Sequence, residues 1–162
     1  MPVPEGPYVD QRYAESIIFD SGHPTLILPQ TSKRAGAFSL DTAVVAWDFS
    51  RAAGRAVADA FPILQKAKRA HVVTVTNEKV IDASRSGPEL AKHLARHGVD
   101  VVLDTVDAAG RSIDAVLDSY IASRNADILV MGAFGHTRIR DFILGATKSM
   151  LAHPPLPAFL SY

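Results

Sequence analysis

The stretch that decides the fold is ILVMGAFGHTRIRDFILGAT, residues 128–147. Its first four residues, Ile128 to Met131, form an apolar run that is typical of a strand buried on both faces. Gly132 and Gly135 follow at once, and after them apolar residues recur at helical spacing. A buried strand, a glycine turn and a helix in this order make one βα unit, which predicts a parallel sheet.

The same βα pattern occurs four times from residue 41 onward and is followed by a fifth strand. We therefore predict an α/β fold, with an open, doubly wound parallel sheet of five strands in the order 3-2-1-4-5 and helices on both faces. The expected strands are Thr42–Trp47, His71–Val75, Val99–Leu103, Ile128–Met131 and Ala158–Ser161. The expected helices cover residues 52–64, with a bend at Pro62, and residues 88–98, 113–121 and 139–150.

Part of the N-terminal region looks like a second copy of the last helix and strand. Ser16-Ile17-Ile18 aligns without gaps with Ser149-Met150-Leu151, and PTLI at residues 24–27 aligns with PAFL at residues 157–160. Coincidence is the alternative, because helix, turn and strand form a common unit. The alignment favours a repeat of the last helix and strand without the rest of a domain.

The chain accordingly divides into two parts. Residues 30–40 are polar and contain a glycine, which is typical of a linker. We predict a helix-strand segment with its linker over residues 1–40 and an α/β domain over residues 41–162. The strand at Pro24–Leu28 is expected to pair with the strand at Ala158–Ser161, either within one chain or swapped between two.

Composition excludes several classes of protein. The 17 lysines and arginines balance the 17 aspartates and glutamates of the 162 residues, so neither nucleic acid nor a membrane surface is an expected partner. The absence of cysteine excludes disulfides, thiolate metal sites and cysteine nucleophiles, and suits a cytoplasmic location. No apolar run approaches the ~18 residues of a membrane span, and no basic region followed by an apolar stretch predicts a signal peptide.

The glycines of the deciding stretch have two interpretations. Gly132 and Gly135 allow a sharp turn and a close approach to a ligand, while Gly145 lies in a helical pattern, where glycine costs about 1 kcal/mol relative to alanine. An anion cradle would explain them, with backbone N–H groups and the hydroxyl of Thr147 or Ser149 binding phosphate oxygens. The alternative is a glycine turn combined with tight packing of a helix on the sheet.

Taken together, these residues resemble the universal stress protein family. The resemblance rests on the order of the elements, on Trp47-Asp48 at the end of the first strand, and on ILVMGAFGHTRIRDFILGA, which is similar to the family motif G-x2-G-x9-G-[ST]. It covers about Thr42 to Ser161 and is closest to the second half of tandem members. In those proteins the last helix and strand of the first half come before the second half. The chain thus looks like a tandem member with a first half reduced to those two elements.

This resemblance implies a site for ATP or a related nucleotide, with Mg²⁺ as a possible companion, near the first and fourth strands. It implies that Asp48 contacts the ribose, that the backbone of Val73 to Val75 contacts adenine, and that the glycine loop covers the phosphates. The residues so implied are Trp47, Asp48, Val73, Met131, Gly132, Gly135, His136, Gly145, Ala146 and Thr147.

The sequence departs from the family pattern at three positions. Ala146 replaces the phosphate-binding hydroxyl, Thr147 is out of register, and Phe49 stands where glycine is usual. Loss of one charge-assisted hydrogen bond removes about 1.5–3 kcal/mol, or roughly ten- to hundredfold in affinity, so a weakened phosphate site is expected. His136 and Arg138 could meet phosphates, although basic residues at a helix start are more often solvated.

Other constellations are less specific. Asp104 and Asp107 follow the third expected strand at the sheet edge, where solvated loop acids are favoured over a metal-binding pair. His93 and His97 have the i, i+4 spacing of zinc ligands, but no H-E-x-x-H pattern or third ligand accompanies them, so solvated helix histidines are favoured. The motifs G-x-S-x-G and G-x4-G-K-[ST] are absent, which argues against a serine hydrolase and a P-loop nucleotidase.

Two classes of function remain. The chain is expected to be a nucleotide-binding stress-response module with at most slow ATP hydrolysis, because no convincing general base or pair of metal-binding acids is found. The alternative is an interaction module of the same fold that has lost its ligand and forms a homodimer through the fifth-strand edge and the N-terminal strand.

Overall fold

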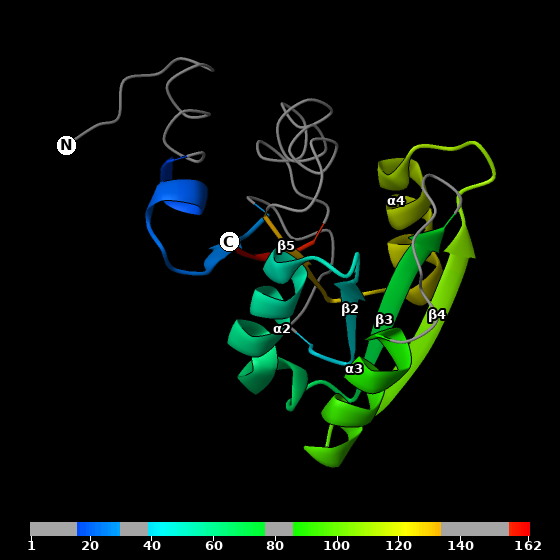
Figure 1. The fold of residues 1–162 in the computed structure, drawn as a ribbon, viewed down its shortest axis with the longest axis horizontal. Coiled ribbons are helices and arrows are strands. Elements are labelled where there is room, and N and C mark those ends of the chain that lie inside the picture. Colours follow the sequence, from blue (N-terminus) through cyan, green and yellow to red (C-terminus); the bar gives the residue numbers. More distant parts are fainter. Residues whose placement is uncertain (1–15, 30–38, 77–85, 134–155) are drawn as a thin grey trace.

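The structure is a computed structural model of the chain, and it describes residues 16–29, 39–76, 86–133 and 156–162 (Figure 1). Its strands are β1 (Thr25–Ile27), β2 (Thr42–Ala46), β3 (Arg69–Thr76), β4 (Val101–Asp107), β5 (Ile128–Gly132) and β6 (Ala158–Ser161). Its bounded helices are α2 (Arg51–Leu64), α3 (Ser86–Arg96) and α4 (Ile113–Arg124). Residues 16–20, which precede β1, are helical as well.

The strands form one sheet in the order β1-β6-β5-β2-β3-β4. Neighbouring strands from β6 to β4 are parallel, whereas β1 is antiparallel to β6. The predicted α/β fold is therefore confirmed. The sheet differs in detail from the predicted five-stranded parallel sheet, because β1 joins it as a sixth strand and makes it mixed.

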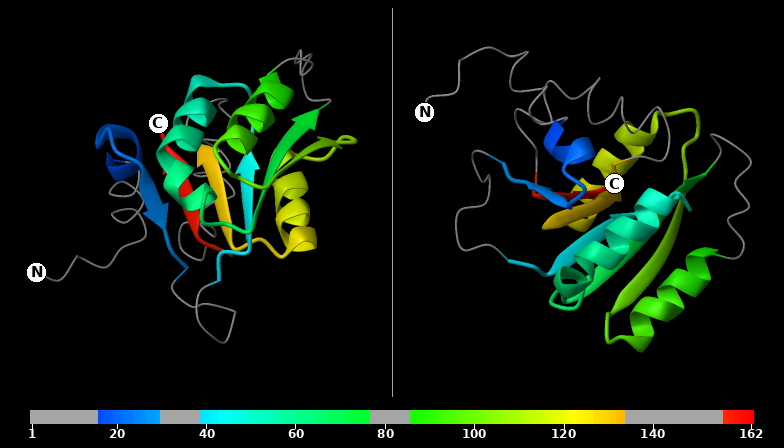
Figure 2. Two further views of the ribbon diagram at one scale, coloured as in Figure 1. Left: turned by 90° about the horizontal axis from the view of Figure 1, so that it is seen from below. Right: turned by 60° about the vertical axis from the view of Figure 1, so that its left-hand side comes forward.

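Helices cover both faces of the sheet, with α2 and α3 on one face and α4 on the other (Figure 2). Alternate residues of β2 serve the two layers: Val45 packs with Leu64 of α2, and Val44 packs with Leu117 of α4 in a second cluster. This alternation follows from the two-residue period of a strand. It explains why β2 has three successive buried residues and β5 is buried throughout.

Two short polar side chains fix the ends of the central elements. Ser50 caps α2, because its Oγ accepts a hydrogen bond from the N–H of Ala53 at 3.0 Å. Asp127, which precedes β5, accepts hydrogen bonds from the N–H groups of Asp41 and Thr42, both at 2.8 Å. These hydrogen bonds hold together the amino ends of the two central strands, β2 and β5.

The edge strand β4 differs from its prediction. A strand is present there, but the expected bounds Val99–Leu103 are wrong. β4 covers Val101–Asp107 and pairs with β3 along its whole length, as far as Thr76↔Asp107. Exposed and half-buried residues alternate along this edge strand, so polar side chains are tolerated there and the apolar run marks only its start. Asp104 consequently lies inside a strand and not in the loop that we expected.

The three helices expected within the described residues are confirmed, those over residues 52–64 and 113–121 as α2 and α4. The helix expected over residues 88–98 is α3, which ends at Arg96, and Gly98 follows in a left-handed conformation with φ of 82°. Pro62 lies inside α2, near its end. The helix expected over residues 139–150 lies outside the described residues.

The N-terminal strand takes the place that the sequence predicted for it. Thr25, Leu26 and Ile27 pair with Leu160, Phe159 and Ala158 respectively, within one chain. The expected pairing of Pro24–Leu28 with Ala158–Ser161 is therefore confirmed in its intramolecular form. The division of the chain at residue 40 stays a prediction.

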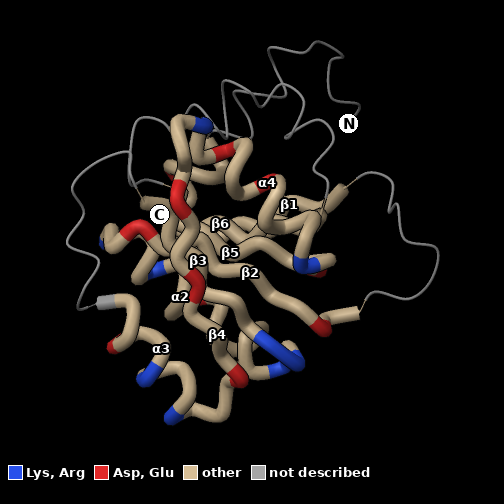
Figure 3. Tube along the Cα trace, turned by 90° about the vertical axis from the view of Figure 1, so that its right-hand side faces the viewer, with Lys and Arg blue, Asp and Glu red and all other residues tan. Residues whose placement is uncertain are grey.

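Charges of both signs are interspersed along the described part of the chain (Figure 3). Several of them pair on the surface, including Lys68 with Asp41 and Arg69 with Asp100, both at 2.9 Å. Among the described helices, none has the length and apolar character of a membrane span.

Candidate functional site

The carboxyl ends of β2, β3 and β5 adjoin at one edge of the sheet. The N–H of Trp47 donates to the carbonyl of Val73 at 2.8 Å, which continues β2 along β3. On the other side, Val45 is paired with Val130, two residues before Gly132. Four predicted site residues thus lie at these carboxyl ends, namely Trp47, Asp48, Met131 and Gly132, while the fifth, Val73, lies deeper in β3.

Gly132 marks a close approach between β5 and α2. A Cβ atom at this position would lie 2.6 Å from the backbone carbon of Ala52 and 2.6 Å from the backbone nitrogen of Ala53. Only glycine permits this contact, so tight packing of a helix on the sheet explains Gly132. The contact also places the first turn of α2 directly beside the end of β5.

Asp48 and Trp47 each carry a buried polar atom that lacks a hydrogen bond to any residue that the structure describes. Asp48 Oδ1 accepts a hydrogen bond from the N–H of Ser50 at 3.0 Å, but Asp48 Oδ2 has no partner, and neither does Trp47 Nε1. Leaving such a group unpaired costs about 1–3 kcal/mol, so buried polar atoms without a hydrogen bond are rare in native structures and call for an explanation. A ligand with a hydroxyl or N–H group would satisfy the free carboxylate oxygen.

Phe49 turns the chain between β2 and α2. Its φ of 63° lies in the left-handed region, which favours glycine and so explains why glycine is usual at this position in the family pattern. The ring of Phe49 packs edge-to-face against that of Trp47, with centroids 5.9 Å apart. The bulky residue therefore has an aromatic partner on the strand it follows.

Val73 lies deeper than the resemblance implies. It is only 1% exposed, and its carbonyl accepts the hydrogen bond from Trp47. β3 continues past it to Thr76, and the half-buried end of the strand begins at Val75 and not at Val73.

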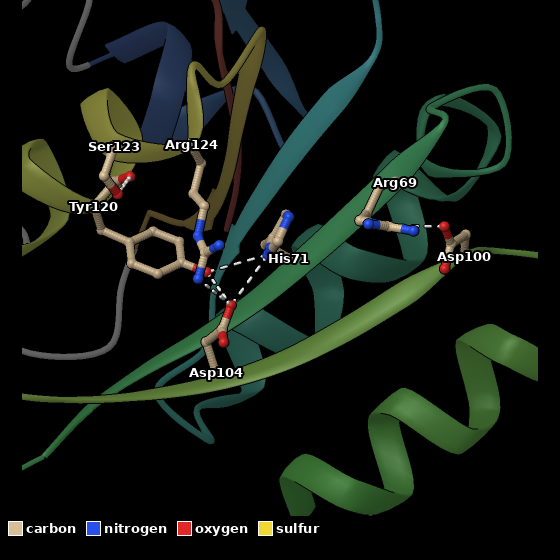
Figure 4. Close-up of polar contacts among 7 residues, drawn as sticks. All are labelled: Arg69, His71, Asp100, Asp104, Tyr120, Ser123 and Arg124. Carbon is tan, nitrogen blue, oxygen red and sulfur yellow. Dashed lines mark hydrogen bonds and ion pairs between the residues drawn. The ribbon is translucent and has the colours of Figure 1, made fainter.

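A second polar cluster, which we call the Asp104 cluster, joins β3, β4 and α4 (Figure 4). Three side chains meet Asp104 Oδ2: the Tyr120 hydroxyl donates to it, His71 Nδ1 lies 3.0 Å away, and Arg124 Nη2 lies 3.5 Å away. The Arg124 guanidinium also stacks over the Tyr120 ring at 5.2 Å. Asp104 is thus not the solvated loop acid that the sequence favoured.

The electrostatics of the Asp104 cluster follow from these contacts. Burial raises the pKa of Asp104, but hydrogen bonds from Tyr120 and His71 and the charge of Arg124 outweigh it and leave the pKa below its ordinary value. Burial and the adjacent carboxylate both raise the pKa of the Tyr120 hydroxyl. The cluster is a hydrogen-bonded ion group that fastens α4 to the sheet edge.

The remaining candidates have local roles. Asp107 ends β4, and its Oδ1 accepts a hydrogen bond from the N–H of Ala109 at 2.7 Å. His93 of α3 and His97, which directly follows α3, are both exposed, and the centroids of their rings lie 4.5 Å apart beside Phe61. The described residues contain no group of three or more His, Cys, Asp or Glu side chains that could hold a metal ion.

Five predicted site residues lie outside the described residues: Gly135, His136, Gly145, Ala146 and Thr147. Among the described residues, sequence reasoning missed the Asp104 cluster. Asp104 is separated from Tyr120, Arg124 and His71 by 16, 20 and 33 positions along the chain, so no local spacing connects it to its partners.

The chain is similar to known proteins in sequence and in structure. A sequence model of the Universal stress protein family matches residues 40–154. A search of curated proteins gives no match. Among solved structures, a universal stress protein from Archaeoglobus fulgidus DSM 4304 has a TM-score of 0.65 and 20% identity, over 94% of this chain and 53% of that chain. This chain therefore spans only about half the length of that relative.

Two further structures match about three quarters of the chain. A protein of the universal stress protein family from Burkholderia pseudomallei has a TM-score of 0.53 and 18% identity, over 78% of this chain and 98% of that chain. A universal stress protein solved in complex with cAMP has a TM-score of 0.53 and 24% identity, over 75% of this chain and 96% of that chain. At these identities the likeness is one of fold.

Proposed function

This chain belongs to the universal stress protein family, and from that premise we propose that it is a stress-response module that binds an adenine nucleotide, ATP above all, through a weakened phosphate site. The observation that carries the proposal is Asp48 Oδ2, a buried carboxylate oxygen with no partner among the described residues, at the carboxyl edge of the central strand β2. Ligands of open α/β sheets bind beyond this edge.

The chemistry of Asp48 fits a nucleotide. A carboxylate accepts hydrogen bonds from vicinal hydroxyl groups, and a ribose offers two of them. Oδ1 is already held by the N–H of Ser50, so the side chain is oriented before a ligand arrives. The relative solved with cAMP supports an adenine nucleotide as the ligand class.

Other residues would contact the adenine and the phosphates of the nucleotide. The end of β3, Val73 to Val75, would contact adenine, and Trp47 and Met131 would flank the site. The loop with Gly132, Gly135 and His136 and the later Gly145, Ala146 and Thr147 would receive the phosphates, with or without Mg²⁺. Because Ala146 has no hydroxyl group, we propose an affinity roughly ten- to hundredfold below that of a member with serine or threonine there.

We propose binding and not rapid turnover. Slow hydrolysis at most is expected, because Asp48, the carboxylate at this end of the sheet, is assigned to the ribose, and the described residues contain no group of three or more His, Cys, Asp or Glu side chains that could hold a metal ion. A cytoplasmic location is part of the same proposal.

Calorimetry tests this function. The purified chain is denatured and its supernatant analysed for released nucleotide, and ATP with Mg²⁺ is then titrated into native protein. We expect measurable heat, a loss of about tenfold or more in affinity in Asp48→Ala, and a gain in Ala146→Ser. Asp107→Ala is the matched control, because this carboxylate also lies at the carboxyl end of a strand, but on the edge strand β4, which β3 separates from β2. A titration without heat, together with no released nucleotide, would contradict the proposal.

The second candidate is a ligand-free interaction module that forms a homodimer. One observation favours it: β1, which pairs with β6, is joined to β2 by the connection from Leu28 to Asp41, which is long enough for β1 to be exchanged between two copies. Light scattering tests this candidate, since an exchanged dimer has twice the mass of the chain.

A further inference from the structure

Two exposed histidines lie together at the end of α3, away from the candidate nucleotide site. The helices α2 and α3 each end shortly before the strand that follows them, β3 and β4 respectively, so their last turns lie at the amino ends of these parallel strands. His93 and His97 belong to this end of the sheet, whereas Asp48 lies beyond the carboxyl end of β2. A role for the two histidines is therefore separate from nucleotide binding.

The rings of His93 and His97 lie side by side. They come from positions one helical turn apart, and their centroids are 4.5 Å apart, with an angle of 47° between the ring planes. A zinc ion binds imidazole nitrogens at about 2.0–2.1 Å, so two nitrogens on one ion lie about 3 Å apart. Small rotations of two exposed side chains bring one nitrogen of each ring to this separation.

A hydrogen bond of His97 leaves one of its ring nitrogens free to act as a ligand. His97 Nδ1 lies 2.8 Å from the carbonyl oxygen of His93, and because a carbonyl group only accepts, Nδ1 is the donor. The neutral ring of His97 therefore carries its lone pair on Nε2. Metal-binding histidines are commonly oriented by such a bond from the other ring nitrogen to a backbone carbonyl.

The neighbouring helix α2, which covers the same face of the sheet, holds the pair in place (Figure 2). Phe61 of α2 packs edge-to-face against the His97 ring at 5.4 Å and contacts the His93 ring at 6.4 Å. Gln65 Nε2 donates a hydrogen bond to the carbonyl of His97 at 3.0 Å, and Gly98 follows with a φ of 82°. Both the ring and the backbone of His97 are thus fixed before an ion arrives, which lowers the entropic cost of binding.

The surrounding charges and the ligand type select the kind of ion. The carbonyl groups at the carboxyl end of an α-helix carry partial negative charge, which favours a cation. Glu89 precedes His93 by one turn, while Lys92 and Arg96 lie on the adjoining stripe of α3, where their charges lower the affinity but leave the ligand positions open. Imidazole suits Zn²⁺, Cu²⁺ and Ni²⁺, whereas Mg²⁺ and Ca²⁺ prefer oxygen ligands.

We propose that His93 and His97 form a two-histidine site for a divalent transition-metal ion such as Zn²⁺ or Cu²⁺. The described residues contain no group of three or more metal-binding side chains, so water molecules fill the remaining coordination positions and the ion is exchangeable. The two rings meet only while this part of the chain is helical, so the bound ion stabilises the end of α3.

Titration of the full chain with Zn²⁺, after a chelator has removed bound metal, tests the site by calorimetry. We expect His93→Ala and His97→Ala each to weaken binding by about tenfold or more. The double variant Lys92→His with His93→Lys keeps the composition and the charge but turns one imidazole by about 100° around the helix, so it should weaken binding as much.

His23→Ala is the matched control. His23 is exposed, and its Nδ1 also lies within hydrogen-bond distance of a backbone carbonyl, that of Ser21 at 2.7 Å, but no second imidazole of the described residues lies beside it. We expect Zn²⁺ binding to be unchanged in this variant.

Two further measurements distinguish a chelating pair from separate surface imidazoles. With one equivalent of Cu²⁺, electron paramagnetic resonance should show splitting by two nitrogen nuclei, reduced to one in His97→Ala. Zn²⁺ should raise the midpoint of urea unfolding of the parent but not that of His97→Ala. The proposal is overturned if Zn²⁺ gives no heat, if the double variant binds as tightly as the parent, or if His23→Ala weakens binding as much as His97→Ala. None of these results bears on the nucleotide titration, which depends on Asp48 at the other end of the sheet.

Discussion

Two aspartates of the same α/β fold, Asp48 and Asp104, differ in the hydrogen-bond partners of their carboxylates. Asp104 Oδ2 is surrounded by the Tyr120 hydroxyl, His71 Nδ1 and Arg124 Nη2, whereas Asp48 Oδ2 is buried without a hydrogen bond to the described residues. The first carboxylate holds an α-helix on a sheet edge. The second is oriented by one hydrogen bond and still has an acceptor to offer, which is the property of a binding site.

The difference separates a stabilising group from a functional one. A fully hydrogen-bonded carboxylate adds to stability, and its loss leaves buried donors unpaired. A buried acceptor without a partner detracts from stability until a ligand arrives. Of the two, only the Asp48 region is therefore a candidate for ligand binding, although its neighbour Gly132 is explained by packing alone.

Removing each carboxylate in turn is the most direct test of this difference, because the two variants should differ most in their free energy of unfolding. We expect Asp104→Ala to lower the free energy of unfolding by about 2 kcal/mol, because Tyr120 and His71 lose their shared acceptor. We expect Asp48→Ala to lower it by less, because loss of the hydrogen bond from the Ser50 N–H to Oδ1 is offset by removal of the unpaired buried Oδ2. Urea unfolding of both variants and the parent measures the two effects.

A matched variant guards against a general effect of losing an aspartate. Asp100→Ala removes an exposed carboxylate that pairs with Arg69 on the surface, and we expect a change well below 1 kcal/mol. Equal losses in Asp48→Ala and Asp104→Ala would show that the two regions do not differ in the way inferred.

The two regions also differ in how far the sequence predicts them. Asp48 is found because it directly follows an apolar run that becomes β2, and β6 is found with its observed bounds for the same reason. The β4 prediction fails after Leu103, because hydrogen bonds to β3 and not hydrophobicity continue the strand. Asp104 was therefore misplaced, and its partners, which come from β3 and α4, leave no local pattern to find.

Phe49, which follows Asp48, allows a test of backbone strain in the candidate binding region. A non-glycine residue in the left-handed region costs about 1 kcal/mol, and φ at Phe49 is 63°. Phe49→Gly relieves the backbone but loses the ring contact with Trp47, whereas Phe49→Ala loses the ring and keeps the strain. We expect the glycine variant to be more stable than the alanine variant by about 1 kcal/mol in thermal unfolding; the reverse order would show that the backbone is not strained there.

The smallest effect concerns pH, and it isolates the Asp104 cluster. The folded pKa of Asp104 lies below its ordinary value, because hydrogen bonds from Tyr120 and His71 and the charge of Arg124 outweigh the opposing effect of burial. A carboxyl group with a lowered pKa contributes stability above its unfolded pKa, and this contribution is lost as the pH falls through the folded value. The side chain is 23% exposed, so we expect less than about 1 kcal/mol from this source.

Asp104→Asn should therefore lose less stability than the parent between about pH 5 and pH 2, measured by urea unfolding at each pH. Part of the acid dependence should persist, because Asp59 also has a lowered pKa: burial raises it, but hydrogen bonds from Ser161 and Arg55 outweigh that effect. An Asp104→Asn variant with the same pH dependence as the parent would mean that Asp104 titrates in the folded protein as it does in the unfolded chain. In that case its three neighbours would be packing contacts and not donors to a carboxylate, and the contrast with Asp48 would rest on burial alone.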